Sequence, residues 1–246
     1  MNPEGSIDRI QELEARLSEL ERLDELKSQF ISLASHELRT PIAVVQGIAA
    51  TLHLRGDELA REQRADLRET LYLQSCRLGE LTEQLLDLSR LDSDALMLSP
   101  VRFHPRERID ELLTRIAPDR LDEVEVAVEP RLQLYTDPNA FERVVANLLT
   151  NALRYGAPPV EVRAQPAHQV DFVVEDHGPG VPDEFVPLLF ERFSQRDRAG
   201  VRRQGAGLGL AIAKSFATAL GGDLRYEPAQ PTGARFCFAL PRELAA

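Results

Sequence analysis

The sequence lacks the features that mark secreted and membrane-spanning proteins. It has only two cysteines, Cys76 and Cys237, which lie far apart and have no histidine or cysteine at ligand spacing. We therefore expect two free thiols in a reducing compartment, and neither a disulfide nor a metal site at these positions. No apolar run reaches the ~18 residues of a membrane span. The start of the chain also lacks the basic and apolar regions of a signal peptide.

A surplus of positive charge is also missing. The 29 Lys and Arg residues face 40 Asp and Glu residues, which leaves a net charge of −11. This balance argues against nucleic acid or an anionic membrane as a partner. The 246 residues suffice for one or two domains, and 43% hydrophobic residues are ordinary for a globular protein. What the chain does contain falls into a helical first part and an alternating strand–helix second part.

Residues 1–27 show the pattern of a coiled-coil signalling helix. Its apolar residues alternate three and four apart, as a coiled-coil seam requires. From Leu20 to Leu23 and Leu26 the spacing becomes three and three, which is a stammer that overwinds a supercoil locally. Two interpretations stay open: a strained joint that transmits a twist, or simple irregularity in a short seam. The regular seam residues are Ile10, Leu13, Leu17 and Leu20.

Residues 28–95 predict a helical hairpin. The first helix continues through the apolar stretch 42–54, a turn follows at 56–62, and a second helix carries a regular seam. Such a hairpin cannot bury all of its apolar stripe alone, so we expect two copies to form a four-helix bundle, making the protein a homodimer. The polar Gln74 on the seam can fix the register. The seam residues of the second helix are Leu67, Leu71, Gln74, Leu78, Leu81, Leu85 and Leu88.

The segment SHELRTP, residues 35–41, lies within the first helix. His36 and Thr40 share a helix face, and Glu37 is adjacent to the imidazole. A neutral imidazole has one nitrogen free to attack an electrophile, while a neighbouring carboxylate fixes its tautomer or takes its proton. This arrangement suits a phosphate-accepting histidine. A solvated surface histidine beside a glutamate is the alternative. Pro41 should kink or loosen the helix.

After a linker at 96–100, residues 101–246 predict an α/β sandwich, in which one helical layer covers a mixed sheet. The expected fold class is therefore α plus α/β, a dimeric helical hairpin followed by this sandwich. We expect the strands 124–128 and 132–136 to pair as a hairpin, and Asp137 to cap a helix at 138–155. The other expected strands are 101–104, 160–164, 170–175, 223–226 and 234–240, and the other helices are 105–116, 183–190 and 206–220.

Two segments of this second part offer polar side chains for a ligand. In NLLTNALRYG, residues 147–156, Asn147 and Asn151 share one helix face, and amide oxygens are suitable ligands for Mg²⁺. The asparagines can alternatively cap neighbouring loops. In EDHGPG, residues 175–180, Asp176 can accept a hydrogen bond from an exocyclic amine. Gly178 and Gly180 permit close backbone approach to a flat base.

Two further segments suit phosphate. LFERF, residues 189–193, opens an arginine-rich run to Gln204 with a local charge of +3, which predicts a mobile basic lid unless it is an ordinary solvated surface. GAGLGLAIAK, residues 205–214, places bare backbone N–H groups at a helix start. It is neither a Walker loop nor a dinucleotide fingerprint. The residues concerned are Arg192, Arg196, Arg198, Arg202 and Arg203 in the run, and Gly205, Gly207 and Gly209 in the glycine segment.

Taken in order, SHELRTP, NLLTNALRYG, DHGPG, FERF and GAGLGL resemble the five sequence boxes of the sensor histidine kinases of two-component systems. The resemblance covers residues 24–242. It implies a dimerisation and phosphotransfer hairpin followed by an ATP-binding domain of the type shared with gyrase and Hsp90. It also implies ATP and Mg²⁺ as cofactors, and the receiver domain of a response regulator as a partner.

The resemblance assigns roles residue by residue. His36 resembles the phosphoacceptor, Glu37 the acidic residue that activates it, and Thr40 the residue that orients water for dephosphorylation. Asn151 resembles the magnesium ligand. The remaining nucleotide-site residues are Asn147, which supports the phosphate site; Arg154, where the family often has lysine; Tyr155; Asp176, the adenine reader; Gly178 and Gly180 below the base; Phe190 and Phe193, the lid anchor; and Gly205, Gly207 and Gly209, the lid hinge and phosphate cradle.

The resemblance therefore implies a protein histidine kinase that phosphorylates itself on His36 and passes the phosphoryl group to an aspartate. Dephosphorylation of the same regulator is a further expectation. The ATP-binding domain would swing on the linker to reach the histidine. A catalytically idle nucleotide-binding scaffold and an ATP-driven clamp related to gyrase or Hsp90 are the alternatives. We expect a cytoplasmic location, with any upstream sensor absent or separate from this chain.

Overall fold

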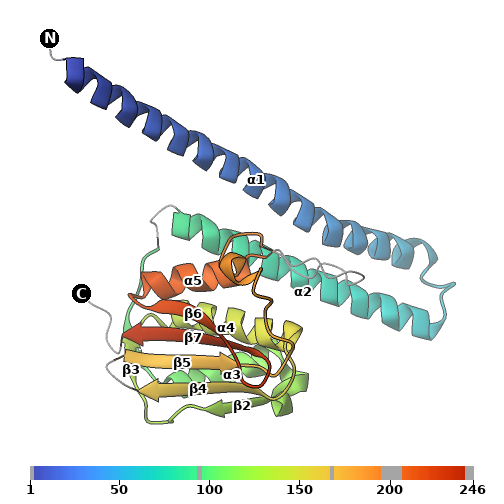
Figure 1. The fold of residues 1–246 in the computed structure, drawn as a ribbon. Coiled ribbons are helices and arrows are strands. Elements are labelled where there is room, and N and C mark those ends of the chain that lie inside the picture. The colour runs from blue at the N-terminus through green and yellow to red at the C-terminus, as the bar shows by residue number, and fades with distance from the viewer. Residues whose placement is uncertain (1–2, 93–95, 167–168, 195–206, 242–246) are drawn as a thin grey trace. The chain divides into compact units, whose positions relative to one another are not determined.

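The computed structural model describes residues 3–92, 96–166, 169–194 and 207–241 (Figure 1). Within it the chain forms two compact units, Met1–Thr82 and Glu83–Ala246, and each is described by itself. The boundary lies inside the second long helix, N-terminal to the linker expected at 96–100. The domain boundaries drawn from the sequence remain a prediction.

The first unit is a helical hairpin, as the periodicity predicts. Helix α1 spans Pro3–Arg55 and helix α2 spans Arg61–Asp92. Helix α1 runs uninterrupted through Pro41, so the expected loosening does not break the helix. The backbone N–H of Ala60 donates to Gln63 Oε1 at 3.1 Å, which satisfies one of the free donors at the start of α2. No described helix is long and apolar enough to cross a membrane.

The predicted seam of α2 faces the interior of the hairpin only in part. Leu81 is buried, and Ile48 of α1 is buried as well. Leu67, Leu71 and Leu78, by contrast, remain half-exposed in the single chain. The hairpin alone therefore leaves part of its apolar stripe uncovered.

The second unit contains a five-stranded mixed sheet in the order β2-β4-β5-β7-β6. Strands β2 and β4 pair in parallel, and the other neighbours pair antiparallel. Its elements, after the end of α2, are β1 Val101–Phe103, α3 Pro105–Ile116, η1 Pro118–Glu123, β2 Val124–Ala127, β3 Leu134–Thr136, α4 Pro138–Tyr155, β4 Val160–Pro166, β5 Gln169–Glu175, η2 Val186–Leu188, α5 Gly209–Ala219, β6 Asp223–Pro228 and β7 Ala234–Pro241.

Two expectations for this unit were wrong. The segments at 124–128 and 132–136 do not form a hairpin: β2 pairs with β4 and β3 pairs with β1, because a turn at Glu129–Leu132 leads the chain away from the sheet. The α-helix expected at 183–190 is reduced to the 3-10 segment Val186–Leu188. Pro187 lies in its middle and lacks the N–H that an α-helix interior needs.

Helix α4 packs its apolar face on the sheet, which confirms the predicted layer. The ring of Phe141 lies 5.0 Å from that of Phe172 in β5 and 6.1 Å from that of Phe238 in β7. Asp137 caps the helix as expected, because its side chain accepts the N–H groups of Asn139 and Ala140 at 2.8 and 2.9 Å. The cap and the aromatic cluster together fix the position of α4 on the sheet.

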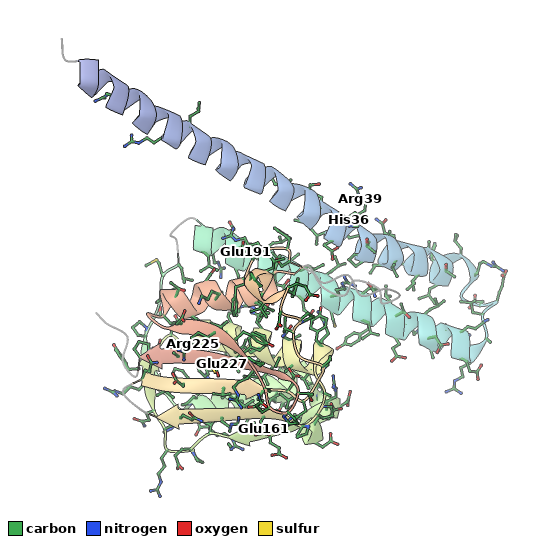
Figure 2. The ribbon with its side chains drawn as sticks, viewed as in Figure 1. His36, Arg39, Glu161, Glu191, Arg225 and Glu227 are labelled. Carbon is green, nitrogen blue, oxygen red and sulfur yellow. The ribbon has the colours of Figure 1, made fainter. Side chains whose placement is uncertain are left out.

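The opposite face of the sheet carries charged side chains. Glu161 of β4 and Arg225 and Glu227 of β6 belong to it (Figure 2). The carboxylate of Glu175 in β5 is paired with Arg163 and, at 2.9 Å, with Arg235. Burial raises the pKa of Glu175, but the two arginines outweigh that effect and hold it below the ordinary value. These pairs anchor the end of β5 from which the next loop departs.

Candidate phosphoacceptor and nucleotide sites

His36 lies on α1 of the first unit with its ring exposed to solvent (Figure 2). Its side chain is 74% exposed, so another group can approach the imidazole. Thr40 follows one turn later, and its hydroxyl donates to the carbonyl oxygen of His36 at 3.5 Å. The structure thus places Thr40 beside His36, as the helical spacing predicts.

Glu37 lies between two positively charged or chargeable partners. Its Oε1 atom is 3.8 Å from Nδ1 of His36, and its Oε2 atom is 3.5 Å from Nη2 of Arg77 on α2. The Glu37 side chain is only 18% exposed. Sequence spacing did not identify Arg77, because its proximity to Glu37 depends on how α2 lies along α1. The expected antiparallel hairpin was the only sequence signal that could have placed Arg77 near Glu37.

On α4, the two asparagines occupy successive turns of one half-buried face. The Asn147 amide donates to the carbonyl of Arg143 at 2.7 Å, which leaves its Oδ1 atom on the opposite side of the amide. A Cβ built on Gly209, the first residue of α5, would lie 2.8 Å from that oxygen. Asn147 therefore borders the start of α5, and the absence of a side chain at Gly209 permits this approach.

Asp176 follows β5 directly and is almost completely buried. Its Oδ1 atom accepts the N–H of Gly178 at 2.8 Å. A Cβ on Gly178 would come within 2.7 Å of the Cα of Gly156, and a Cβ on Gly156 would overlap the Asp176 side chain. The end of α4 and the loop after β5 thus meet through two glycines, with the carboxylate between them.

A third glycine, not identified from the sequence, completes this contact. Gly233 precedes β7 with a φ of +127°, and a Cβ there would overlap the backbone oxygen of Asp176. Gly180 has a φ of +70°, as expected for a glycine-dependent turn. Burial raises the pKa of Asp176 above the ordinary carboxyl value, against the opposing hydrogen bond from Gly178. The isolated glycine in the turn before the last strand was the only sequence signal for Gly233.

The phenylalanines of FERF lie near the glycine segment and the sheet. The Phe193 backbone N–H donates to the Gly207 carbonyl at 2.8 Å, and Phe193 has a φ of +64°. The Phe190 ring packs edge-on against Phe236 of β7 with centroids 6.5 Å apart. Lys214 of α5 lies 5.4 Å above the Phe190 ring centre. These contacts connect FERF to the glycine segment and to the sheet.

The start of α5 has no side-chain cap. Leu208 occupies the N-cap position and provides no side-chain hydrogen bond, and Gly207 before it has a φ of +67°. Within the described ranges, the N-cap residue thus leaves the first N–H groups of this helix uncapped, which suits an anion. Gly205 and most of the predicted lid, including Arg196, Arg198, Arg202 and Arg203, lie outside the described residues.

The described residues fit a nucleotide bound along α4. Gly156 and Asn147 are nine residues apart, which corresponds to roughly 13 Å along a helix. Asp176 with its glycines lies at one end of this stretch, and the start of α5 lies at the other. Arg154 and Tyr155 are exposed in the last turn of α4. The buried carboxylate of Asp176, with three glycines packed closely around it, is a suitable acceptor for the amino group of a flat base.

The asparagines also fit a magnesium ion that is held mainly by phosphates. No group of three or more His, Cys, Asp or Glu residues within the described ranges is placed to hold a metal. Mg²⁺ commonly takes one or two protein oxygens together with phosphate oxygens and waters. The amide oxygen of Asn151 is of the required type, and Asn147 lies one turn away.

The second unit also includes the C-terminal end of α2. Arg143 of α4 lies 2.7 Å from the carboxylate of Glu83 and 3.2 Å from that of Asp87. Asp87 is buried, and this burial raises its pKa although Arg143 acts in the opposite direction. The same residue, Arg143, accepts the Asn147 amide on its carbonyl. Ion pairs therefore connect the end of α2 to α4, the helix that carries both asparagines.

Comparison with known proteins agrees with these sites. Residues 26–94 match the His Kinase A (phospho-acceptor) domain, and residues 136–244 match the histidine kinase-, DNA gyrase B-, and HSP90-like ATPase family. The first match contains His36, Glu37 and Thr40. The second contains both asparagines, Asp176 and the glycine segment.

Individual relatives resemble the chain over most of its length. It is 30% identical over 241 residues to the signal transduction histidine-protein kinase AfsQ2 of Streptomyces coelicolor, which covers 94% of this chain and 45% of that protein. It is 35% identical over 231 residues to the histidine-protein kinase/phosphatase MprB of Mycolicibacterium paratuberculosis, covering 88% and 43%. The chain thus spans less than half the length of these two curated relatives.

A solved structure shows the same fold. The Acinetobacter baumannii histidine kinase AdeS matches with a TM-score of 0.66 at 27% identity, covering 84% of this chain and 98% of that one. The two family matches and the relatives agree on one family, and this structure agrees with the fold of the chain. The chain belongs to the sensor histidine kinases of two-component systems.

Proposed function

We propose that the protein transfers the γ-phosphoryl group of ATP to His36 and then to an aspartate in the receiver domain of a response regulator. The observation that carries this proposal is the solvent-exposed imidazole of His36 beside Glu37, in a chain that also contains an ATP-binding domain. An exposed ring is needed because the phosphoryl donor and the phosphoryl acceptor must both reach it.

The geometry around His36 supports a defined proton path. The Glu37 carboxylate faces Nδ1, which leaves Nε2 as the nucleophile. The lone pair of Nε2 forms the N–P bond, the bond from phosphorus to the bridging oxygen of ADP breaks, and the proton on Nδ1 moves to Glu37. The 3.8 Å separation must shorten in the reacting complex, as is common for catalytic hydrogen bonds.

The second unit supplies ATP binding and positioning. Asp176 accepts a hydrogen bond from the adenine amine, and Gly156, Gly178 and Gly233 allow the backbone to pack closely around Asp176 and hold it in place. The free N–H groups at the start of α5 receive phosphate oxygens. Asn151 would hold Mg²⁺ through its amide oxygen, and the ion would supply charge neutralisation for the phosphoryl group that is transferred.

Dephosphorylation of the regulator is a second proposed activity of the same site. Thr40 presents its hydroxyl on the turn after His36, where it can orient a water molecule toward a phosphorylated partner. The relative MprB carries the description kinase/phosphatase. We place both activities in a cytoplasmic homodimer, since ATP is the phosphoryl donor and the helical hairpin leaves apolar seam residues half-exposed.

The direct test is incubation with γ-labelled ATP and Mg²⁺, followed by measurement of label on the protein. Wild-type protein should acquire acid-labile, base-stable label, as a phosphohistidine does, and His36→Gln should acquire none. His53→Gln is a matched control, because His53 lies on the same helix outside the segment SHELRTP. Equal labelling of wild type and His36→Gln would refute the assignment. Nucleotide binding without any label would support the idle scaffold instead.

A further inference from the structure

The carboxylate of Glu37 is shared between two partners, one on each helix of the hairpin. Its Oε1 atom faces His36 Nδ1 at 3.8 Å, and its Oε2 atom faces Arg77 Nη2 at 3.5 Å. The side chains of Glu37 and Arg77 are 18% and 31% exposed, whereas that of His36 is 74% exposed. One oxygen of the carboxylate thus points to the solvent-exposed ring, and the other points to a largely covered cation.

We infer that Arg77 is a positioning residue for histidine phosphorylation: it holds Glu37 so that one carboxylate oxygen stays directed at Nδ1 of His36. This inference rests on the proposed function of His36. A glutamate on a helix surface has three side-chain torsions and would otherwise sample many orientations. An arginine on the facing helix restricts this freedom at one oxygen and leaves the second oxygen available.

The pair is better explained by orientation than by stability. Partly exposed ion pairs contribute little to the free energy of folding. The Nη2–Oε2 distance of 3.5 Å is also longer than a well-formed charge-assisted hydrogen bond. Loss of Arg77 should therefore leave the hairpin folded. It should act on the proton transfer from Nδ1 to Glu37 that accompanies N–P bond formation.

The geometry also explains why the position calls for a long cation. Arg77 is on α2, so its side chain must cross from one helix to the other to reach Glu37. Lysine can place a positive charge in the same region, but as a point charge without the planar fork. Glutamine keeps much of the side-chain length and removes the charge. The three residues thus form a graded series for this site.

The test measures autophosphorylation of the full chain in the variants Arg77→Gln, Arg77→Lys and Arg68→Gln. Arg68 is exposed nine residues earlier on α2, close to the opposite side of the helix, and serves as the control. We expect Arg77→Gln to lower the maximal rate about tenfold, a fraction of the roughly 10²- to 10⁴-fold that general acid–base catalysis contributes. The KM for ATP should stay unchanged, because the nucleotide binds in the other unit. Arg77→Lys should recover part of the rate, and Arg68→Gln should match the wild type.

A double-mutant cycle with Glu37→Gln separates this role from a structural one. If Arg77 acts through Glu37, then Arg77→Gln should have no further effect in the Glu37→Gln background. Additive losses, or an unchanged rate in Arg77→Gln alone, would overturn the inference. Circular dichroism and thermal unfolding of each variant identify any loss of rate that comes from misfolding. If Arg77→Gln misfolds, Arg77→Lys supplies the test. Absence of wild-type labelling would instead refute the proposed function itself.

Discussion

At the scale of single residues, the proposed nucleotide site contains a carboxylate whose charged form is destabilised by burial. Asp176 is almost fully buried, and its surroundings raise its pKa. A group with a folded-state pKa above its unfolded value makes folding less favourable as pH rises through the interval between those two values. At neutral pH the charged Asp176 therefore costs stability, and we propose that this charge serves nucleotide binding.

Replacing Asp176 by asparagine should separate binding from stability. We expect nucleotide binding to weaken roughly 10- to 100-fold, because a hydrogen bond to a charged acceptor contributes ~1.5–3 kcal/mol. The free energy of unfolding at neutral pH should not fall, because the asparagine oxygen can still accept the Gly178 N–H and the buried charge is gone. Calorimetric titration with ATP and urea denaturation measure the two quantities. Asp171→Asn is the control, because Asp171 lies on the face of the sheet opposite to α4. An ATP affinity of Asp176→Asn equal to that of the wild type would contradict the proposed role.

A substitution at Gly233 should affect both the stability of the fold and nucleotide binding. Its φ of +127° and the overlap of any Cβ with the Asp176 carbonyl make alanine unfavourable there. We expect Gly233→Ala to lower the free energy of unfolding by ~1–3 kcal/mol and to weaken nucleotide binding. Gly79 of α2 has open space around its Cβ position, so Gly79→Ala should stabilise the chain by about 0.5–1 kcal/mol. Denaturant unfolding of both variants checks the contrast, and similar effects would argue against the packing described.

Much of the residue-level site could be predicted, because its chemistry is local. His36, Glu37 and Thr40 are neighbours on one helix, and so are Asn147 and Asn151. Arg77, Gly156 and Gly233 were not identified, since each becomes relevant only through contact with a distant segment. Sequence spacing within one element does not contain that information.

At the scale of elements, hydrophobic periodicity predicts whether a segment is a helix or a strand better than it predicts which strands pair. The start of the helix at Pro138–Tyr155 was predicted correctly and its end approximately, because Asp137 and Pro138 mark its start and its apolar stripe is regular. The pairing of β2 was missed because alternation is the same for parallel and antiparallel neighbours. The prediction of a short α-helix before Phe190 was wrong because Pro187 lacks the N–H that an α-helix interior needs.

The contact between the end of α2 and α4 allows a test at this scale. Removing the arginine side chain by Arg143→Ala leaves the buried Asp87 carboxylate without the ion pair to Arg143 and with only the weaker attraction of Arg90. We expect the free energy of unfolding to fall by about 1–3 kcal/mol, less than for a fully buried pair because Arg143 is partly exposed. Urea denaturation measures this loss.

Two controls define the cause. The double variant Asp87→Asn with Arg143→Ala should recover most of the lost stability, because no buried charge remains. The loss in Arg143→Ala should also diminish as the pH falls toward the ordinary carboxyl value, since protonated Asp87 needs no counter-ion. A loss that persists unchanged in the double variant and at low pH would show that Arg143 stabilises the fold through packing alone.

At the scale of the whole molecule, we predict that the hairpin pairs with a second copy of the chain. Leu67, Leu71 and Leu78 are seam residues that the single chain leaves half-exposed. We expect the protein to sediment as a dimer, and Leu71→Asp to shift it toward the monomer by placing a charge in the bundle interior. Leu73, which is exposed and off the seam, provides the control Leu73→Asp. Analytical ultracentrifugation would contradict the bundle if both variants, or neither, dissociated.

The central claim is that one exposed imidazole on the hairpin receives the phosphoryl group of ATP. The most direct measurement is mass spectrometric mapping of the intact phosphorylated protein, kept at neutral to basic pH so that a phosphoramidate survives. The account predicts one phosphoryl group per chain, located on His36 and bound through Nε2. A phosphoryl group found on another residue, with His36 unmodified, would contradict it.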